Sequence, residues 1–503
     1  MHALMMTVMV IGCVAADPGV DAARAWREAH GAEILCDYAE LLSIPNVSDD
    51  LPSLRRNAVY IRDRLIERGV ESRLLEIDGA APIVFGRLNA PGATRTIGVY
   101  AHYDGQPVDA GAWRTTEPFE PALYNGPIEY GGAPLDWPAP GDVVDPEWRM
   151  YARGSGDDKA PIMAILVALD ALRDASVAPT SDVIFFFEGE EEAGSTHLGA
   201  HLAAARDLIA PVDLWLICDG PAHQSRRPQL VFGARGITSL EITVFGAVRT
   251  LHSGHYGSWA PNPAMELAHL LASMKDADGR VLVEGFYDST IPPGPAERAA
   301  MARVPEIGPA LRRELGLRET EAHNAPYLER LMIPSLNVRG LRAATVGASA
   351  RNIVPDRATA SIDVRLAKGN NPSVMLDLIE RHIERQGFTI VRDEPTAAER
   401  FRLGRVVRVT RGGGYRAVRT PMDEPAIEPI VRAVVRASGE EPFLVPTLGG
   451  SLPLYLFEDL GRAPLVILPI ANHDDNQHAP DENLRVANLW YGVDVMAAAL
   501  TTP

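Results

Sequence analysis

The chain has 503 residues, of which 46% are hydrophobic and 23% are charged. This composition is typical of a globular protein with two or three domains, and it excludes a collagen, a coiled coil or a disordered chain. The 66 acidic and 48 basic residues give a formal net charge of −18. That charge argues against non-specific binding to nucleic acids and against binding to anionic membranes through charge.

The N-terminal segment, residues 3–16, is apolar almost without a break. It is too short to span a membrane, which takes about 20 residues, but it suits a secretory signal with a small-residue cleavage site at residues 14–16. Residues 10–13 also resemble the short box that precedes a lipid-modified cysteine, here Cys13. We therefore expect residues 1–16 to be a signal segment of an exported, periplasmic or extracellular protein. Because no Lys or Arg precedes the apolar run, a cytoplasmic location is the alternative.

The first half of the chain alternates between helical and strand patterns. Helices are predicted over residues 23–42, 54–68 and 160–175. Strands are predicted over residues 82–88, 96–100, 183–187 and 212–218. The last two are short, continuous apolar runs, as buried parallel strands require. This alternation predicts an α/β fold with a mixed, mostly parallel sheet flanked by helices.

The pattern changes after about residue 235. Strands with alternating polarity are predicted over residues 237–245 and 358–366, helices over 263–274 and 375–386, and a loop over 411–414. From about residue 422 the apolar βα pattern returns, at residues 427–437 and 465–468. The simplest interpretation is one α/β domain in two parts, residues 17–235 and 421–503, interrupted by an inserted α+β domain at residues 236–420.

Five polar clusters lie at or after the ends of predicted strands or open a predicted helix. They are residues 102–104 (HYD), 154–159 (GSGDDK), 188–195 (EGEEEAGS), 219–221 (DGP) and 477–482 (QHAPDE). Ligands bind at the carboxyl ends of strands in open α/β sheets, so this placement indicates a functional site.

Each cluster also has an ordinary structural interpretation. His102 and Asp104 could be a surface pair, and Asp157 or Asp158 could cap the helix that follows. The acidic run could be a solvated turn. If it is desolvated, however, its mutually repelling carboxylates need a cation or raised pKa values.

Taken together, the clusters supply two histidines and several carboxylates. This donor set suits zinc, with cobalt or manganese as alternatives. The number of donors suffices for two ions that share one carboxylate, an arrangement used for hydrolysis. A carboxylate not bound to metal could then act as base and acid in turn.

The clusters and their neighbours resemble the motifs of a family of co-catalytic metallopeptidases. The family includes carnosinases, glutamate carboxypeptidase, aminoacylase and succinyl-diaminopimelate desuccinylase. The matching stretches run in the family's order from about residue 35 to the end: YAHYDGQPV, RGSGDDKAP, FEGEEEAGS, LHSGHYG, RNIVPDRATASIDVR, GGSLP and QHAPDENLR. The combination is highly specific, although no single motif is.

The resemblance implies two Zn²⁺ ions per chain, with Co²⁺ or Mn²⁺ as alternatives. The implied ligands of one ion are His102, Asp157 and Asp219. Those of the other are Asp157, which bridges, together with Glu192 and His478. His473 is a rival to His478, but His478 fits the family pattern H-x-P-[DN]-E.

The resemblance also implies the catalytic roles. Asp104 would orient His102, and Glu191 would be the general base and acid. Glu191 is preferred to Glu190 because the family's acidic pair directly precedes a residue followed by Gly-Ser.

In the family, the inserted domain is a lid that usually also forms the homodimer. His252 would reach the partner subunit's active site and stabilise the oxyanion. Arg365 would hold the terminal carboxylate of the substrate, and Gly450 and Ser451 would add contacts. Without the resemblance, each of these would be read as a loop, turn or strand-end residue.

We therefore expect a binuclear zinc metallopeptidase that hydrolyses a peptide bond in dipeptides or at the C-terminus of short peptides, with a metal-bridged water activated by Glu191. The spelling HYDGQPV is carnosinase-like and favours dipeptides or short peptides. The alternatives are an aminoacylase or amidohydrolase acting on N-acyl amino acids, an inactive relative that serves as a binding protein, and a protein with one structural metal.

Overall fold

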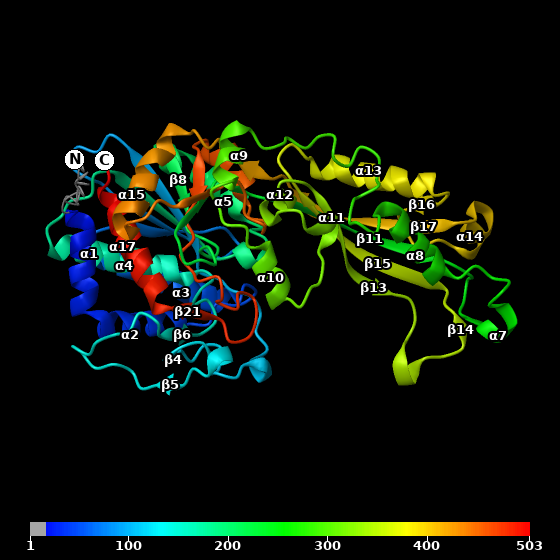
Figure 1. Ribbon diagram of the computed structural model, residues 1–503, viewed down its shortest axis with the longest axis horizontal. Coiled ribbons are helices and arrows are strands. Elements are labelled where there is room, and N and C mark those ends of the chain that lie inside the picture. Colours follow the sequence, from blue (N-terminus) through cyan, green and yellow to red (C-terminus); the bar gives the residue numbers. More distant parts are fainter. Residues whose placement is uncertain (1–16) are drawn as a thin grey trace, which may run out of the picture. The chain divides into compact units, whose positions relative to one another are not determined.

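The computed structural model describes residues 17–503, so residues 1–16 lie outside the described part (Figure 1). The chain divides into two compact units. Of the described residues, the first unit comprises 17–228, 426–442 and 468–503, and the second comprises Gln229–Pro425 and Phe443–Ile467.

The sheet strands of the first unit follow the order β1-β2-β7-β3-β8. Their bounds are β1 Glu71–Leu75, β2 Ile83–Leu88, β3 Thr96–His102, β7 Asp182–Glu188 and β8 Leu214–Ile217. β7, β3 and β8 are parallel, whereas β2 is antiparallel to β7 and β1 to β2. The expected mixed, mostly parallel sheet is therefore confirmed. The carboxyl ends of its three parallel strands lie at one edge.

The parallel strands are buried as their apolar sequences predict. All seven residues of β3 are buried, and so are six of the seven in β7. Gly98 in β3 allows an especially close approach, because a Cβ atom there would lie 2.5 Å from the indole ring of Trp215 in β8. A second, smaller sheet has the order β21-β6-β4-β5, with bounds Asn483–Arg485, Arg149–Tyr151, Ala122–Tyr124 and Pro134–Leu135.

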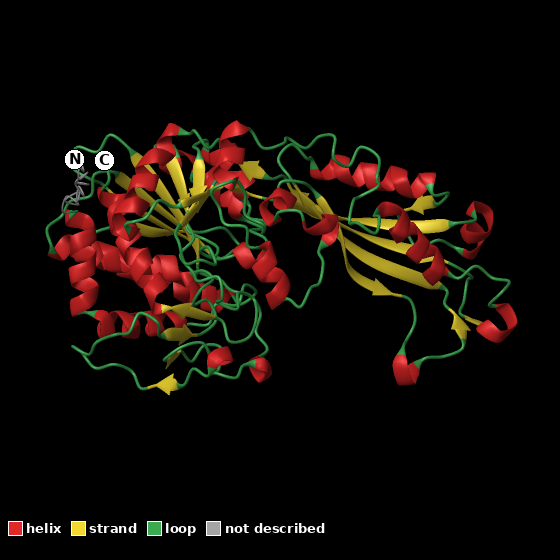
Figure 2. Cartoon of the chain, in the orientation of Figure 1, coloured by secondary structure: helices red, strands yellow, loops and turns green. Residues whose placement is uncertain are grey.

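Helices flank these strands (Figure 2). The helices of the first unit are α1 Pro18–Ala29, α2 Gly31–Leu42, α3 Leu51–Glu67, α4 Lys159–Asp174, α5 Leu198–Ala204, α6 Arg206–Ile209, α15 Glu428–Ser438 and α17 Val486–Thr501. α4 packs against β3, α1 and α17, which explains why it is apolar nearly all round.

The single helix predicted over residues 23–42 is wrong, because the structure has two helices there. The backbone of His30 leaves the helical region, with φ −123° and ψ 22°, and separates α1 from α2. α1 also begins earlier than predicted. The Asp17 side chain accepts hydrogen bonds from the N–H groups of Gly19 and Val20, which is an N-terminal cap.

The second unit contains a five-stranded sheet with the order β13-β15-β11-β17-β16. The bounds are Ser335–Arg342, Arg357–Leu366, Gly236–Phe245, Val406–Tyr415 and Thr389–Val391. All neighbours are antiparallel except β16 and β17. Helices α8 (Pro263–Met274) and α13 (Pro372–Arg385) pack on this sheet around one apolar core. α8 has the predicted bounds, with Asn262 as its cap.

The remaining elements of the second unit are short. The strands are β9 Gln229–Val231, β10 Gly233–Ala234, β12 Leu251–His252, β14 Ile353–Val354, β18 Val418–Arg419, β19 Phe443–Val445 and β20 Leu465–Ile467. The helices are α7 Ser253–Tyr256, α9 Pro295–Met301, α10 Gly308–Glu314, α11 Glu321–Asn324, α12 Tyr327–Leu331, α14 Ala397–Leu403 and α16 Leu454–Leu456.

The loop predicted over residues 411–414 is wrong, because these residues belong to β17. The glycines are needed for contact with β11, where the pairing register shifts. A Cβ atom at Gly412 would lie 2.1 Å from Ser239 Oγ, and one at Gly414 would lie 2.3 Å from the Ile237 carbonyl oxygen. Glycine in a strand commonly marks such a close approach or bulge. Among residues 17–503, no helix combines the length and apolar character that a membrane span needs.

Candidate metal centre

The parallel strands of the first unit bring most of the predicted site to one sheet edge. His102 is the last residue of β3 and pairs in register with Glu188, the last residue of β7. Asp219 follows β8 by two residues. Glu191 and Glu192 lie in a single turn of 3-10 helix directly after β7. Clusters that are far apart in the sequence thus lie close together, because the carboxyl ends of neighbouring strands are adjacent.

The first group of ligand candidates comprises His102, Asp157 and Asp219. One ligand atom from each lies within 4.8 Å of the others. His102 Nε2 is 3.0 Å from Asp157 Oδ1 and 3.8 Å from Asp219 Oδ2. All three residues are buried, and Asp219 Oδ2 has no hydrogen-bond partner among the described residues. A buried carboxylate oxygen without a partner is costly, so this position fits a bound cation.

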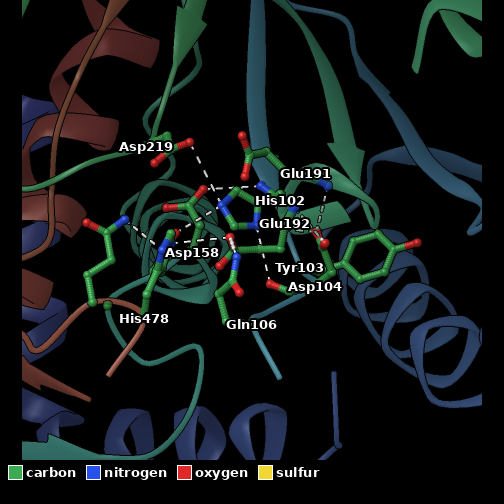
Figure 3. Close-up of polar contacts among 12 residues, drawn as sticks. His102, Tyr103, Asp104, Gln106, Asp158, Glu191, Glu192, Asp219 and His478 are labelled. Carbon is green, nitrogen blue, oxygen red and sulfur yellow. Dashed lines mark hydrogen bonds and ion pairs between the residues drawn. The ribbon is translucent and has the colours of Figure 1, made fainter. Parts of the chain in front are cut away.

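The second group comprises Asp157, Glu192 and His478. His478 Nε2 is 3.0 Å from Asp157 Oδ2 and 3.2 Å from Glu192 Oε2. Asp157 therefore presents one oxygen to each histidine and belongs to both groups. Figure 3 shows His102 and His478 approaching this centre from different segments of the chain.

The donor set fits divalent cations. Two imidazole nitrogens and three carboxylates are ligands that zinc and similar ions accept, and the shared carboxylate suits two adjacent ions. In the absence of a cation, the neighbouring carboxylates change the pKa of His102. Burial opposes the charged imidazolium, yet Asp104 and Asp157 raise the pKa of His102 well above its ordinary value.

Asp104 contacts both sides of the centre. Its Oδ1 atom lies 3.4 Å from His102 Nδ1. Its two oxygens also accept hydrogen bonds from the backbone N–H groups of Glu191, at 3.1 Å, and Glu192, at 2.9 Å. This one buried carboxylate can therefore orient the imidazole and hold the turn that carries both glutamates.

Glu191 and Glu190 have different surroundings. Glu191 lies beside His102 and Asp219 (Figure 3), and loss of hydration, with the nearby carboxylates, raises the pKa of its carboxyl group well above the ordinary value. Glu190 instead accepts hydrogen bonds from the Ala81 N–H at 2.9 Å and lies 2.8 Å from His197 Nδ1. Glu190 is thus engaged in local structure, and Glu191 faces the centre.

His473, the rival metal ligand, and Asp158, a possible cap of α4, make other contacts in the structure. His473 is in neither group; its Nδ1 atom lies 3.9 Å from Asp474 Oδ1. Asp158 occupies the cap position of α4, but its side chain makes no capping hydrogen bond with the described backbone. It accepts a hydrogen bond from the His102 N–H at 3.1 Å instead.

The predicted substrate-binding residues gather within the second unit. Arg365 Nη1 donates to Ser451 Oγ at 2.7 Å, and the Gly450 carbonyl accepts a hydrogen bond from the Arg235 N–H at 3.3 Å. His252 lies in β12, exposed, with its ring 4.7 Å from that of His255. Its contact with a second subunit stays a prediction.

Three further residues of the site were not predicted. Gln106 Nε2 donates to Glu192 Oε2 at 2.7 Å, and Gln477 Nε2 donates to Asp157 Oδ2 at 2.7 Å. Glu482 accepts hydrogen bonds from the backbone of the segment that carries Asp157. Their position inside the HYDGQ and QHAPDE stretches is the signal that could have identified them, and Glu482 is the last residue of the pattern H-x-P-[DN]-E that begins at His478.

Comparisons with known proteins identify the family of this chain. Residues 98–502 match the family described as Peptidase family M20/M25/M40. The Cys-Gly metallodipeptidase DUG1 of Candida albicans is 26% identical over 485 residues, which cover 91% of this chain and 92% of that protein. The human Beta-Ala-His dipeptidase is 25% identical over 423 residues, which cover 83% of this chain and 76% of that protein.

Solved structures share the fold. The M20 family metallo-carboxypeptidase Sso-CP2 from Sulfolobus solfataricus superposes with a TM-score of 0.76 at 26% identity. The superposition covers 93% of this chain and 99% of that one.

The predicted export is wrong. The Cys-Gly metallodipeptidases of yeasts, which align over 91–92% of this chain, give no support for a signal segment or a lipid anchor at Cys13. The apolar segment on which the prediction rested, residues 1–16, lies outside the described residues.

The family match spans residues 98–502 of 503, the Candida albicans relative is named a metallodipeptidase, and the Sulfolobus solfataricus structure, which shares the fold, is named a metallo-carboxypeptidase. This chain therefore belongs to Peptidase family M20/M25/M40 and is a metal-dependent peptidase.

Proposed function

We propose that this protein is a binuclear zinc dipeptidase. The observation that carries the proposal is that Asp157 faces His102 with one carboxylate oxygen and His478 with the other, each at 3.0 Å. In the proposal, His102, Asp157 and Asp219 hold one ion, and Asp157, Glu192 and His478 hold the second. Co²⁺ or Mn²⁺ could replace zinc, since the same nitrogen and oxygen donors accept them.

Dipeptides are the proposed substrates because relatives that align over most of this chain are named for Cys-Gly and Beta-Ala-His dipeptides. The last peptide bond of a short peptide also lies close to a free carboxylate, so the C-terminal residues of short peptides are included in the proposed substrates. When bound, two divalent ions lower the pKa of water and polarise the carbonyl group of the scissile bond.

The residues of the chain do the remaining chemistry. Glu191 accepts a proton from the attacking water at its carboxylate and delivers it to the leaving amine nitrogen. A carboxylate whose pKa is raised by burial is a stronger base than one in water. The Asp104 carboxylate keeps Glu191 in place by accepting a hydrogen bond from the backbone N–H of Glu191.

The second unit supplies the proposed substrate contacts. The Arg365 guanidinium binds the terminal carboxylate, with Gly450 and Ser451 beside it, because a planar fork of N–H donors matches a carboxylate. Residues 236–420 act as a lid that closes over the substrate and forms a homodimer, in which His252 stabilises the oxyanion in the partner's site.

A substrate panel with the zinc-loaded protein tests the proposal. Cys-Gly, β-Ala-His and neutral dipeptides are compared with their C-terminal amides and with N-acetyl amino acids, and bound zinc is measured on the same samples. We expect two zinc equivalents per chain and hydrolysis of dipeptides that is lost on chelation and restored by zinc. Hydrolysis of N-acetyl amino acids without any dipeptide hydrolysis would instead identify an aminoacylase.

A further inference from the structure

Glu482 is a buried carboxylate at the end of the loop that carries His478. Its exposed fraction is 0%. Its Oε1 atom accepts hydrogen bonds from two successive backbone N–H groups, those of Gly156 and Asp157, each at 3.0 Å. It therefore fixes the main chain at the residue whose side chain lies between the two histidines.

The other oxygen of Glu482 is held by Arg153. Nη1 of this buried arginine donates to Glu482 Oε2 at 2.5 Å, and its Nη2 donates to the Ala479 carbonyl oxygen at 3.3 Å. The guanidinium also lies over the Trp113 ring, 5.7 Å from its centre. Arg153 and Glu482 thus join the segment that carries Asp157 to the loop that carries His478.

Glu482 is not itself a ligand candidate, because both of its oxygens are already occupied by N–H donors and it is in neither group of metal-ligating residues found among residues 17–503. All three partners are donors, so the carboxylate acts only as an acceptor. A glutamine cannot reproduce this arrangement. Either way round, its NH₂ group would face an N–H donor, of Arg153 or of the Gly156–Asp157 backbone.

We propose that Glu482 is a positioning residue that holds Asp157 where its carboxylate can be shared by both metal sites. The inference rests on the metal ligands assigned under the proposed function. Without Glu482, two buried N–H groups lose their acceptor and the turn at Asp157 is free to move. Because Asp157 belongs to both sites, both sites weaken together. Partners that orient metal ligands typically contribute 10- to 100-fold to metal affinity.

Cobalt binding to the full-length protein tests this directly. The metal-free parent and Glu482→Gln are titrated with Co²⁺ in competition with a chromophoric chelator, and the visible spectrum of the bound cobalt is recorded. We expect both dissociation constants of Glu482→Gln to rise about 10- to 100-fold, with a changed cobalt spectrum. Arg153→Lys keeps the charge next to Glu482 and leaves the two backbone hydrogen bonds, so it should weaken both sites by about tenfold or less. This second variant also covers the case in which Glu482→Gln does not fold.

Glu380 provides a matched control in the second unit. It is also buried and is held by two arginines, with Arg392 and Arg411 donating to Oε1 at 2.7 and 2.8 Å. Glu380→Gln should lower the thermal unfolding temperature of the metal-free protein and leave cobalt affinity and spectrum unchanged.

Each outcome decides the proposal. Parental affinity and spectrum in both Glu482→Gln and Arg153→Lys would overturn it, as would weakening of only one site or equal weakening by Glu380→Gln. A parent that binds no cobalt would overturn the ligand assignment and this inference together. A parent that binds two cobalt ions but hydrolyses no dipeptide would reject the proposed substrate, while the affinities of the variants would still decide the role of Glu482.

Discussion

The Nε2 atom of His478 lies 3.0 Å from Oδ2 of Asp157, although the two residues belong to segments far apart in the sequence. The same nitrogen is 3.2 Å from Glu192 Oε2. His473, in the same loop, points instead to Asp474, with 3.9 Å between Nδ1 and Oδ1. Only one of the two histidines of this loop is thus placed to complete the second metal site.

Because only His478 lies at the second metal site, we expect replacement of the two histidines to change the bound zinc differently. His478→Ala should reduce the zinc that survives dialysis from two equivalents per chain to about one, because a three-ligand site loses its only imidazole. His473→Ala should keep two equivalents. Zinc is measured by atomic emission on the dialysed proteins. Loss of zinc in His473→Ala, with none in His478→Ala, would assign the ligand to His473.

Replacing Glu191 should separate catalysis from metal binding. We expect Glu191→Gln to lower kcat for dipeptides by about 10²- to 10⁴-fold, because the amide cannot accept the proton of the water, while both zinc ions stay bound. Glu190→Gln is the control, since Glu190 contacts Ala81 and His197, and it should keep most of the turnover. Unchanged turnover in Glu191→Gln with full zinc content would reject Glu191 as the base.

The features predicted well from the sequence depend on local signals. α8 has the predicted bounds because Asn262 caps it and Pro263 opens it. The break at His30 was missed because one non-helical residue hardly disturbs the apolar period. The strand at residues 411–414 was missed because its glycines are required by close contacts with Ser239 and Ile237 in another strand. The sequence next to the glycines does not indicate these contacts.

The candidate site follows the same rule. The polar clusters stood out because their residue types suit a metal and several of them follow strand patterns, but the resemblance to the metallopeptidase family was needed to name the ligands as His102, Asp157, Asp219, Glu192 and His478. Glu482 could not be assigned, because its role depends on backbone N–H groups that only folding brings to it. Export was predicted from the apolar run at residues 3–16 and the small-residue pattern at its end, and such a local pattern does not by itself decide where a protein is located.

Arg365 should affect substrate binding through the terminal carboxylate. Arg365→Met should raise KM for dipeptides by about 10- to 100-fold, the value of a charge-assisted hydrogen bond, with much less effect on dipeptide amides. Arg339 offers a matched control in the second unit, since its Nε donates to Ser361 Oγ at 2.9 Å much as Arg365 donates to Ser451. Arg339→Met should leave KM unchanged. Equal effects on dipeptides and their amides would argue against carboxylate binding by Arg365.

Gly98 tests the packing of the sheet that carries the site. A methyl group at this position would lie 2.5 Å from the Trp215 ring, which is itself fully buried. Gly98→Ala should therefore lower the free energy of unfolding by about 1–3 kcal/mol, measured in urea. At Gly126, in the same unit, no described atom lies within 4 Å of the position that a Cβ atom would take, so Gly126→Ala should have little effect. Equal stabilities of the two variants would contradict the close contact between β3 and β8.

Glu380 predicts a pH dependence of stability. Burial opposes its charged form, but hydrogen bonds from Arg411 and Arg392 lower the pKa of Glu380 from 4.5 to about 2. Because the pKa is lower in the folded state, this stabilisation is fully present above about pH 4.5 and is lost as the pH falls towards 2. The two arginines are partly exposed to solvent, which weakens the stabilisation by these ion pairs. We therefore expect Glu380→Gln to be about 1–3 kcal/mol less stable than the parent at pH 7. Urea unfolding at pH 7, 5 and 3.5 should show this difference shrinking at the lowest pH, because Glu380 then binds a proton in the unfolded parent, which favours unfolding, whereas the glutamine of the variant does not titrate. A difference that stays constant from pH 7 to 3.5 would show that the two arginines do not lower the pKa of Glu380.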